Sequence, residues 1–345
     1  MLNDRIEGRW IDAFEATFAA CKAGPDQQAI ILSETQSRDL NVHLAELALS
    51  RMKVPFFHLK LPSPAPEAPA IIRSSGASLA LNGQEGAVRA LAAADFVVDL
   101  TVEGLMHAPQ TGEILQGGAR ILNISNEHPE MLERALPDDD LKARCQAAAR
   151  LCRGAREMVV TSDAGTDLRV KMGGNRTVAV WGWTDRPGTL AHWPGGIVVS
   201  FPAAGSVNGR LVFQPGDMNL TFKRYFESRV TFDLSDDYVT DIKGDGTDAR
   251  LMRAYLEAFG EREAYATSHV GWGLNRGARY EALAMYDKRD TNATELRAVA
   301  GNFLYSTGAN EFAGRFTKGH FDLPMMGCTI AVDGQVVVDQ GRLVE

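Results

Sequence analysis

The chain has 345 residues, of which 45% are hydrophobic and 23% are charged. This composition excludes a disordered or fibrous protein, and the length favours about two domains. The net charge of −8 argues against a nucleic-acid partner, because proteins that bind the phosphate backbone present an excess of lysine and arginine. The sequence has no apolar run of membrane-helix length and no signal-type stretch near its first residues, so we expect a cytoplasmic protein without membrane contact.

The first half of the sequence alternates between helix-like and strand-like segments. Apolar residues recur at helical spacing from Asp4 to Ala23, and helices are also predicted over residues 38–52, 86–94 and 138–155. Short runs rich in apolar and β-branched residues predict strands over residues 29–34, 55–61, 96–102 and 119–125. Strands that alternate with helices are typical of βαβ units, so we predict a mostly parallel sheet here.

The second half has many short strand-like runs separated by turn residues. Gly, Asn208-Gly209 and Asp-Asp pairs punctuate these runs, which favours a largely antiparallel sheet. Helices are predicted over residues 247–259 and near 294–304, and the C-terminal CTIAVDGQVVVD is predicted to be a hairpin that turns at Asp333-Gly334. The predicted fold class is thus α/β plus α+β. An α/β domain with a parallel sheet (residues 1–155) precedes a mostly antiparallel β domain with helices (residues 156–345).

Common motifs for nucleotide, zinc-protease and serine-hydrolase sites are absent from the sequence. GxxxxGK[ST], HExxH and GxSxG do not occur, and GWGLNRG (271–277) lies outside any βαβ context. The four cysteines have no CxxC spacing, so we interpret them as buried free thiols.

A candidate metal site lies in the last third of the sequence. His320 and Asp322 are two residues apart, so on an extended segment both side chains point to the same face. With one more imidazole they would form a 2-His-1-carboxylate triad, which leaves positions open on iron(II) for substrate and oxygen. His269, just before a glycine-rich turn, is the best third ligand. The alternative for the His-x-Asp motif is a structural hydrogen bond between the two side chains at a strand end.

Other polar residues in small-residue segments are candidates for the same site. His107 follows the fourth predicted strand and His192 lies in a Trp/Pro/Gly loop, positions that suit proton transfer near neutral pH. Ser306 can donate a hydrogen bond to a ligand, and Arg297 can hold an anionic oxygen. The alternatives are structural or exposed histidines and an Arg297 that pairs with a surface carboxylate.

Several separated motifs resemble the 2,5-dihydroxypyridine 5,6-dioxygenase family, which is related in fold to the thermophilic-type metalloaminopeptidases. The motifs are SHVGWGL, GNFLYSTG and the late HxD followed by Leu-Pro, together with DLTVEGLMHAPQ and the DRPG…HWPGG stretch. The resemblance runs through most of the chain. It implies an aminopeptidase-like scaffold and an extradiol-type enzyme of nicotinate breakdown that uses O2 to open the ring of 2,5-dihydroxypyridine or a related hydroxylated heteroaromatic compound.

The resemblance also implies roles for individual residues. His269, His320 and Asp322 would bind Fe(II), and Ser306 would lie near the oxygen site. His107 and His192 would position the ring and move protons. The residues that would contact the small aromatic substrate are Arg297, Leu105, Val180 and Trp183. The family resemblance further suggests a homo-oligomer.

Two departures from related patterns bear on the function. Ile197 stands where a metal-binding glutamate is expected in the peptidases, and His269 replaces another peptidase glutamate, so a two-metal peptidase is disfavoured. Val180 stands where a substrate-binding glutamate is expected in the dioxygenases, which points to a related ring as substrate. A metalloaminopeptidase-like hydrolase and a non-catalytic small-molecule-binding protein on the same scaffold remain the alternative functions.

Overall fold

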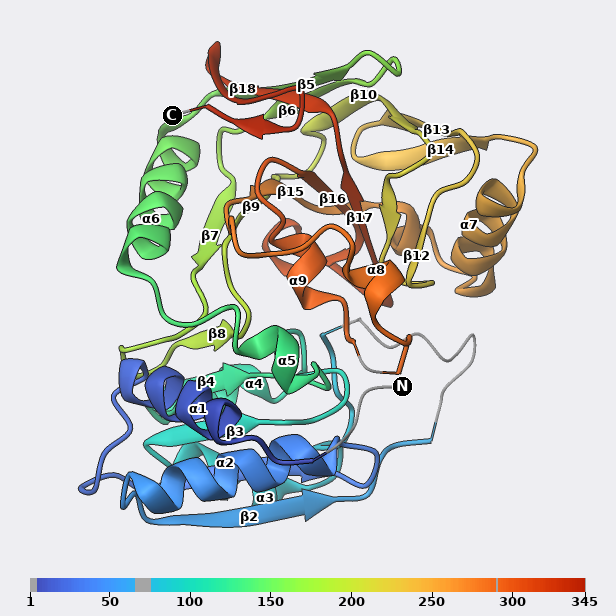
Figure 1. Cartoon of the computed structure of the whole chain (residues 1–345). Coiled ribbons are helices and arrows are strands. Elements are labelled where there is room, and N and C mark those ends of the chain that lie inside the picture. Colours follow the sequence, from blue (N-terminus) through green and yellow to red (C-terminus); the bar gives the residue numbers. More distant parts are fainter. Residues whose placement is uncertain (1–4, 66–75, 290, 345) are drawn as a thin grey trace.

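The computed structural model describes residues 5–65, 76–289 and 291–344, and it consists of two lobes stacked on one another (Figure 1). The first lobe is built on a five-stranded sheet in which all neighbouring strands are parallel, which confirms the predicted parallel sheet. Its strands in spatial order are β2 (Phe56–Leu61), β1 (Ala29–Glu34), β3 (Phe96–Asp99), β4 (Arg120–Asn123) and β8 (Leu190–His192).

Helices cover both faces of this parallel sheet. Ile31 of β1 packs in one apolar cluster with residues of α1 and α2, whereas Ile30 packs in another with residues of α3 and α4. All six residues of β1 are buried, which explains why its sequence is almost continuously apolar. The helices of the first half are α1 (Gly8–Ala20), α2 (Asp39–Arg51), α3 (Glu85–Ala92), α4 (Thr111–Gln116), α5 (Pro129–Leu132) and α6 (Asp139–Gly154). The helix predicted from Asp4 therefore begins at Gly8, and Asp4 lies outside the described residues.

The second lobe contains two larger antiparallel sheets and a short two-stranded one. The eight-stranded sheet has the order β14 (Tyr238–Lys243), β13 (Val230–Ser235), β10 (Val207–Phe213), β6 (Asp167–Lys171), β5 (Glu157–Ser162), β18 (Cys328–Val332), β19 (Gln335–Asp339) and β20 (Arg342–Leu343). The five-stranded sheet has the order β17 (Arg315–Met325), β16 (Phe303–Asn310), β15 (Thr267–Gly273), β9 (Ile197–Phe201) and β7 (Arg176–Val180). The small sheet pairs β11 (Met218–Asn219) with β12 (Arg224–Tyr225).

Short helices connect and flank these sheets. They are α7 (Thr247–Ala258), η1 (Arg262–Tyr265), α8 (Ala282–Met285), α9 (Thr294–Arg297) and η2 (Glu311–Ala313). In Figure 1, α7 lies at the outer edge of the second lobe, whereas α8 and α9 lie on its side toward the first lobe. No helix in the described ranges is long and apolar enough to cross a membrane.

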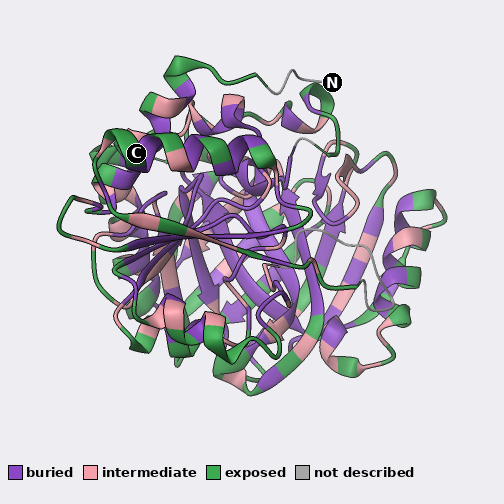
Figure 2. Cartoon of the chain, turned by 90° about the horizontal axis from the view of Figure 1, so that it is seen from below, coloured by how far each residue is buried: buried purple, intermediate pink, exposed green. Residues whose placement is uncertain are grey.

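The five-stranded sheet has two different faces, and this difference positions the site. Phe321 and Leu323 of β17 belong to the large core shared with the eight-stranded sheet, together with Val160 of β5. Because strand residues alternate between faces, His320 and Asp322 lie on the opposite face, toward the first lobe. Figure 2 shows the strands in the middle of the molecule as almost continuously buried.

Two local predictions were wrong. The helix expected near 294–304 ends at Arg297, because Val299 and Ala300 form β-bridges with the chain at and just after the end of β15. Asn208-Gly209 does not form a turn but lies within β10. A Cβ at Gly209 would lie 2.2 Å from the backbone oxygen of Asp167, so glycine is needed here for close approach of β6. The C-terminal hairpin is confirmed, with Asp333 and Gly334 between β18 and β19.

One strand links the two halves of the sequence. β8 lies well after residue 155, yet its Leu190, Ala191 and His192 pair with β4 of the first lobe. The domain boundary at residue 155 stays a prediction. The pairing of β8 carries His192 to the edge of the parallel sheet that faces the second lobe.

Candidate active site

Two strands of the five-stranded sheet bring the three candidate metal-ligand side chains together. His269 comes from β15, and His320 and Asp322 come from β17, with β16 between them in the sheet. The Nε2 of His320 lies 3.2 Å from the Oδ1 of Asp322, and the Nε2 of His269 lies 3.6 Å from the same oxygen. One potential ligand atom from each residue lies within 4.8 Å of the others. These spacings suit three protein ligands around one ion.

Asp322 is held as a buried carboxylate by two other side chains. Arg297 of α9 donates its Nε–H to Oδ2 at 2.6 Å, and the hydroxyl of Ser306 on β16 donates to Oδ1. Burial alone would raise the pKa of Asp322, but the neighbouring charges of His320 and Arg297 hold it well below its usual value. The group therefore carries a negative charge at neutral pH.

Three histidines near Asp322 are kept neutral by burial. Desolvation lowers the pKa of His269 to about 3, the pKa of His107 to about 3 and the pKa of His192 to about 4. Arg297 adds to this effect at all three residues. A neutral imidazole is the form that binds a metal ion or accepts a proton.

The three ligand residues fit a divalent metal ion. Nδ1 of His269 is buried without a hydrogen-bond partner among the described residues, and the contact of its Nε2 with Asp322 is longer than a hydrogen bond. A buried polar atom normally has a bonding partner. A cation bound between this imidazole and the ionised carboxylate would supply one. The mixed nitrogen and oxygen donors suit a first-row transition metal such as iron(II), and in the described part of the chain no fourth His, Cys, Asp or Glu joins this group.

A cavity of about 360 Å³ opens beside these three residues, between the two lobes. His107 and His192 both line it, as do Arg297 and Val180. The ring centroid of His107 lies 5.3 Å from that of His320. The structure thus brings His107, His192, Arg297 and Val180 into one cavity with the predicted metal ligands.

The environment of His192 fixes its tautomer. Its Nδ1 lies 2.5 Å from the backbone oxygen of Pro194, which can only accept a hydrogen bond, so the neutral ring carries its proton on Nδ1. The other nitrogen, Nε2, then has a free lone pair. His192 is therefore suited to accept a proton from a group in the cavity.

Other predicted contacts lie elsewhere. Leu105 is fully buried in the cluster of α3 and α4, and Trp183 packs in the core of the first lobe, so neither lines the cavity. The backbone N–H of Leu105 is held by Asp99 at 2.7 Å, which fixes the loop that carries His107. Ser306 lies behind Asp322, which it orients by its hydrogen bond.

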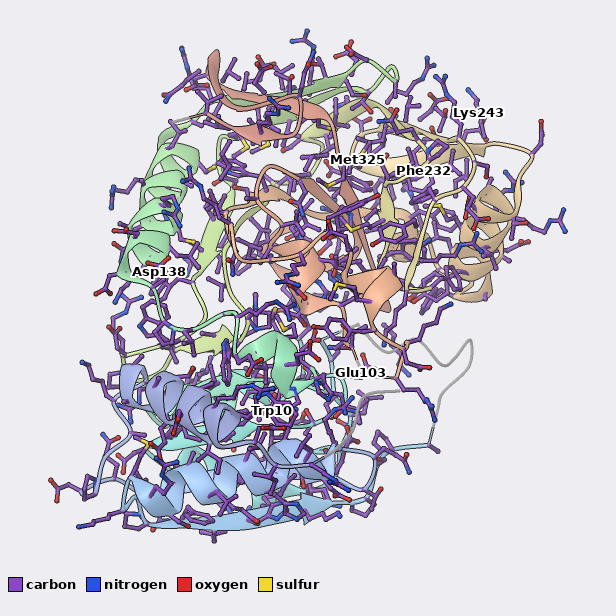
Figure 3. All side chains as sticks on the ribbon, viewed as in Figure 1. Trp10, Glu103, Asp138, Phe232, Lys243 and Met325 are labelled. Carbon is purple, nitrogen blue, oxygen red and sulfur yellow. The ribbon has the colours of Figure 1, made fainter. Side chains whose placement is uncertain are left out.

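The sequence analysis missed several polar residues that line the cavity. These residues are Glu103, Asn123, Ser125, Asn292 and Thr294. Glu103 lies at the junction between the lobes in Figure 3. The first three follow the carboxyl ends of β3 and β4, where ligand sites of parallel sheets occur, and that rule could have identified them.

A buried carboxylate attaches the segment before α9 to the first lobe. Glu127 accepts hydrogen bonds from the backbone N–H of Thr294 at 2.7 Å and from the hydroxyl of Thr291 at 3.1 Å. Arg134 binds both carboxylate oxygens of Glu295, at 2.8 and 3.0 Å. Since α9 also carries Arg297, these contacts fix the cation that clamps Asp322.

The fold and the site together define a class of protein: a two-lobed scaffold of one parallel and two larger antiparallel sheets, with a His-His-Asp group beside a cavity between the lobes. The family model for 2,5-dihydroxypyridine 5,6-dioxygenase (NicX) matches residues 9–345. The chain belongs to this family. This result confirms the resemblance and the fold class expected from the sequence.

Individual relatives agree with the family assignment. A 2,5-dihydroxypyridine 5,6-dioxygenase of Pseudomonas putida KT2440 is 36% identical over 336 residues, which cover 96% of this chain and 95% of the relative. A solved structure of 2,5-dihydroxypyridine dioxygenase from the same organism matches with a TM-score of 0.92 and 35% identity, covering 100% of this chain and 98% of that one. Wild-type AmpT from Thermus thermophilus matches with a TM-score of 0.67 at 14% identity over 98% of this chain and 99% of that one, a likeness of fold alone.

Proposed function

We propose that this chain is an iron(II)-dependent dioxygenase that opens the ring of 2,5-dihydroxypyridine or a close derivative. The observation that carries the proposal is the His269–His320–Asp322 group, whose ligand atoms lie within 4.8 Å of one another beside a cavity of about 360 Å³. Family membership supports the reaction class, since the relatives are named for cleavage of this ring.

The reaction needs no co-reactant besides O2. Cleavage of the bond between C5 and C6 with insertion of both oxygen atoms converts 2,5-dihydroxypyridine into N-formylmaleamate, and all atoms are conserved. Bound iron(II) would supply open positions for O2 and a ring oxygen and would favour the deprotonated ring hydroxyl.

The protein residues have separate tasks around the ring. Nε2 of His192 accepts the proton of a ring hydroxyl, because Nδ1 is committed to Pro194. His107, also neutral, lies beside His320 and can accept or return a proton on that side of the cavity. Arg297 stabilises negative charge on the bound ring while it orients Asp322.

Oxygen uptake tests the proposal directly. Protein loaded anaerobically with iron(II) should consume O2 stoichiometrically when 2,5-dihydroxypyridine is added, with loss of the ring chromophore. Metal-free protein is the control. Hydrolysis of a small peptide without oxygen consumption would support the hydrolase alternative, and absence of both reactions with no iron retained would favour a binding protein.

The cellular setting is part of the same proposal. We expect a cytoplasmic homo-oligomer that takes a small aromatic substrate and O2 and serves the degradation of nicotinate or a related ring. Sedimentation analysis of the purified protein would determine the subunit number.

A further inference from the structure

Apart from the candidate metal ligands, the five-stranded sheet lines the cavity with apolar side chains, whereas the first lobe contributes several polar ones. The aliphatic wall consists of lining residues from β7, β9 and β16, namely Val178, Val180, Ile197, Val199 and Leu304. All five belong to or pack against one apolar cluster. In the described part of the chain, every cavity-lining residue of β7 and β9 is apolar, since Phe201 is the only other one.

The strand register places this wall at a definite distance from the metal ligands. Val199 of β9 pairs with Gly271 of β15 and with Val178 of β7, and Gly271 pairs with Leu304. Gly271 is two residues beyond His269, so this row lies about 7 Å along the strand from the ligand histidine. The pair of Val180 and Ile197 lies two residues further, at about 14 Å.

The cavity is larger than an unsubstituted ring requires. Its volume of about 360 Å³ falls at the lower end of the range of roughly 300–1,000 Å³ found for sites that hold drug-sized ligands. A ring held at the metal ligands would reach the first aliphatic row and leave the space over Val180 and Ile197 unfilled. Filling that space with an apolar group would remove apolar surface from water and improve binding.

The polar groups of the cavity come from elements other than β7 and β9. Asn123 and Ser125 follow β4 of the first lobe, Arg297 belongs to α9, and Glu311 belongs to η2 after β16. A charged substituent that faced β7 and β9 would lose its hydration without gaining a partner among the lining residues of those two strands, which is costly. The wall therefore favours ring substituents that are apolar over ones that are charged.

From these observations we propose that the preferred substrate is a 2,5-dihydroxypyridine that carries an alkyl substituent facing Val180 and Ile197. The inference rests on the proposed function for the orientation of the ring. In that orientation the C5–C6 bond lies at the metal ligands and the opposite C2–C3 edge points away from them. With the C2 hydroxyl turned toward Asn123 and Ser125 of the first lobe, C3 faces the wall, so the substituent is on C3. Val178, Val180, Ile197, Val199 and Leu304 then determine substrate specificity.

Binding without turnover tests the inference independently of catalysis. Iron(II)-loaded protein is titrated calorimetrically under strict exclusion of oxygen with 2,5-dihydroxypyridine and with its 3-methyl, 3-propyl and 3-carboxylate derivatives. Each alkyl carbon buried against the wall should lower Kd roughly fourfold. The 3-carboxylate should bind more weakly than the unsubstituted ring, because no cation of β7 or β9 lines the cavity.

A matched pair of variants assigns the preference to the wall. Val180→Thr keeps the side-chain shape and adds a hydroxyl, and it should reduce the preference for 3-propyl over the unsubstituted ring by roughly fivefold or more. Val170→Thr makes the same change at a buried valine of β6, in the other sheet, and should leave the preference unchanged.

The outcomes separate this inference from the proposed function. Equal or weaker binding of the 3-propyl ring, with normal oxygen uptake on 2,5-dihydroxypyridine, would overturn the inference and leave the dioxygenase intact. A retained 3-propyl preference that depends on Val180, without oxygen uptake on any ring, would support the wall and overturn the dioxygenase. Failure of all four rings to bind would overturn both.

Discussion

The Nε of Arg297 lies 2.6 Å from the Oδ2 of Asp322, so a cation from α9 holds the carboxylate that is expected to bind the metal. Ser306 holds the other oxygen of the same carboxylate. Asp322 is therefore fixed and ionised before any metal binds, and its remaining electron pairs are aimed at His269 and His320. Preorganisation of this kind lowers the entropic cost of binding an ion.

The first prediction concerns the metal ligands. His320→Ala should lose iron and oxygen uptake together, because two remaining ligands cannot hold the ion against water. Metal content per chain, measured after anaerobic iron(II) loading and gel filtration, should fall from about one to near zero. His58→Ala removes a partly exposed histidine of β2 and should keep both iron and activity. Full activity in the His320 variant would overturn the metal assignment.

The second prediction separates Arg297 from the metal. Arg297→Ala removes one partner of a buried ion pair, and in metal-free protein this should cost about 3–5 kcal/mol of unfolding free energy. Bound iron(II) restores a positive charge beside Asp322, so the loss should shrink clearly in loaded protein. Urea unfolding with and without metal measures the difference.

A second buried pair serves as the control for Arg297. The Nη1 of Arg315 lies 2.6 Å from the Oδ2 of Asp237. Neither residue lines the cavity or belongs to the metal group. Arg315→Ala should therefore destabilise the protein equally in both metal states. If Arg297→Ala also destabilises both metal states equally, bound iron(II) does not replace the charge of Arg297 beside Asp322.

Much of the fold could be predicted because its signals are local. The strand at residues 29–34 shows in a short run that begins with four apolar residues, and the structure gives β1 the same bounds. The metal group could be predicted for a similar reason. The two-residue spacing of His320 and Asp322 places both on one strand face, and His269 was predicted from its place before a glycine-rich turn and from the resemblance.

The other cavity residues and the end of α9 could not be predicted, because they depend on contacts between residues far apart in the sequence. Asn123 and Asn292 line one cavity although they come from different lobes, and neither has an unusual local sequence. The resemblance implied a contact between Leu105 and the ring, but its side chain packs in the core of the first lobe. The end of α9 depends on β-bridges from Val299 and Ala300 to a segment more than 20 residues earlier in the sequence.

The third prediction concerns proton transfer. His192→Ala should keep iron near one per chain but lower kcat by roughly 10²–10⁴-fold, the usual contribution of a general acid or base. His192→Gln keeps a polar side chain without a basic nitrogen and should be equally slow. A variant that loses iron together with activity would instead make His192 part of the metal site.

The fourth prediction is a pH dependence of stability. Burial raises the pKa of Asp217 to about 7, although hydrogen bonds from the backbone of Gln214 and Met326 oppose the shift. The folded state thus keeps a proton that the unfolded state releases near pH 4. The protonated Asp217 therefore adds its full contribution to the unfolding free energy below about pH 4. That contribution, up to about 4 kcal/mol, is lost as the pH rises to about 7.

Asp217→Asn measures that contribution. An amide cannot titrate, so the unfolding free energy of the wild type should fall relative to that of the variant between pH 4 and pH 7. The comparison uses urea unfolding at several pH values in one buffer system. Parallel curves for the two proteins would show that Asp217 is ionised in the folded state throughout this range.

The fifth prediction concerns the attachment of α9 to the first lobe. Glu127→Gln replaces one acceptor oxygen by an NH2 group, so either the Thr294 N–H or the Thr291 hydroxyl faces a donor. We expect a loss of about 1–3 kcal/mol of stability. Because Asn292 and Thr294 line the cavity, KM should also rise several-fold.

Asp248→Asn is the matched control for Glu127→Gln. Asp248 is also a buried carboxylate that holds a loop, through the backbone N–H groups of Glu227 and Ser228, but it does not line the cavity. Asp248→Asn should lower the unfolding free energy about as much as Glu127→Gln does, and it should leave KM unchanged. If both variants raise KM equally, the effect of Glu127 is general loosening of the fold. If only Glu127→Gln does so, the carboxylate positions the segment that carries Asn292, Thr294 and Arg297 against the substrate.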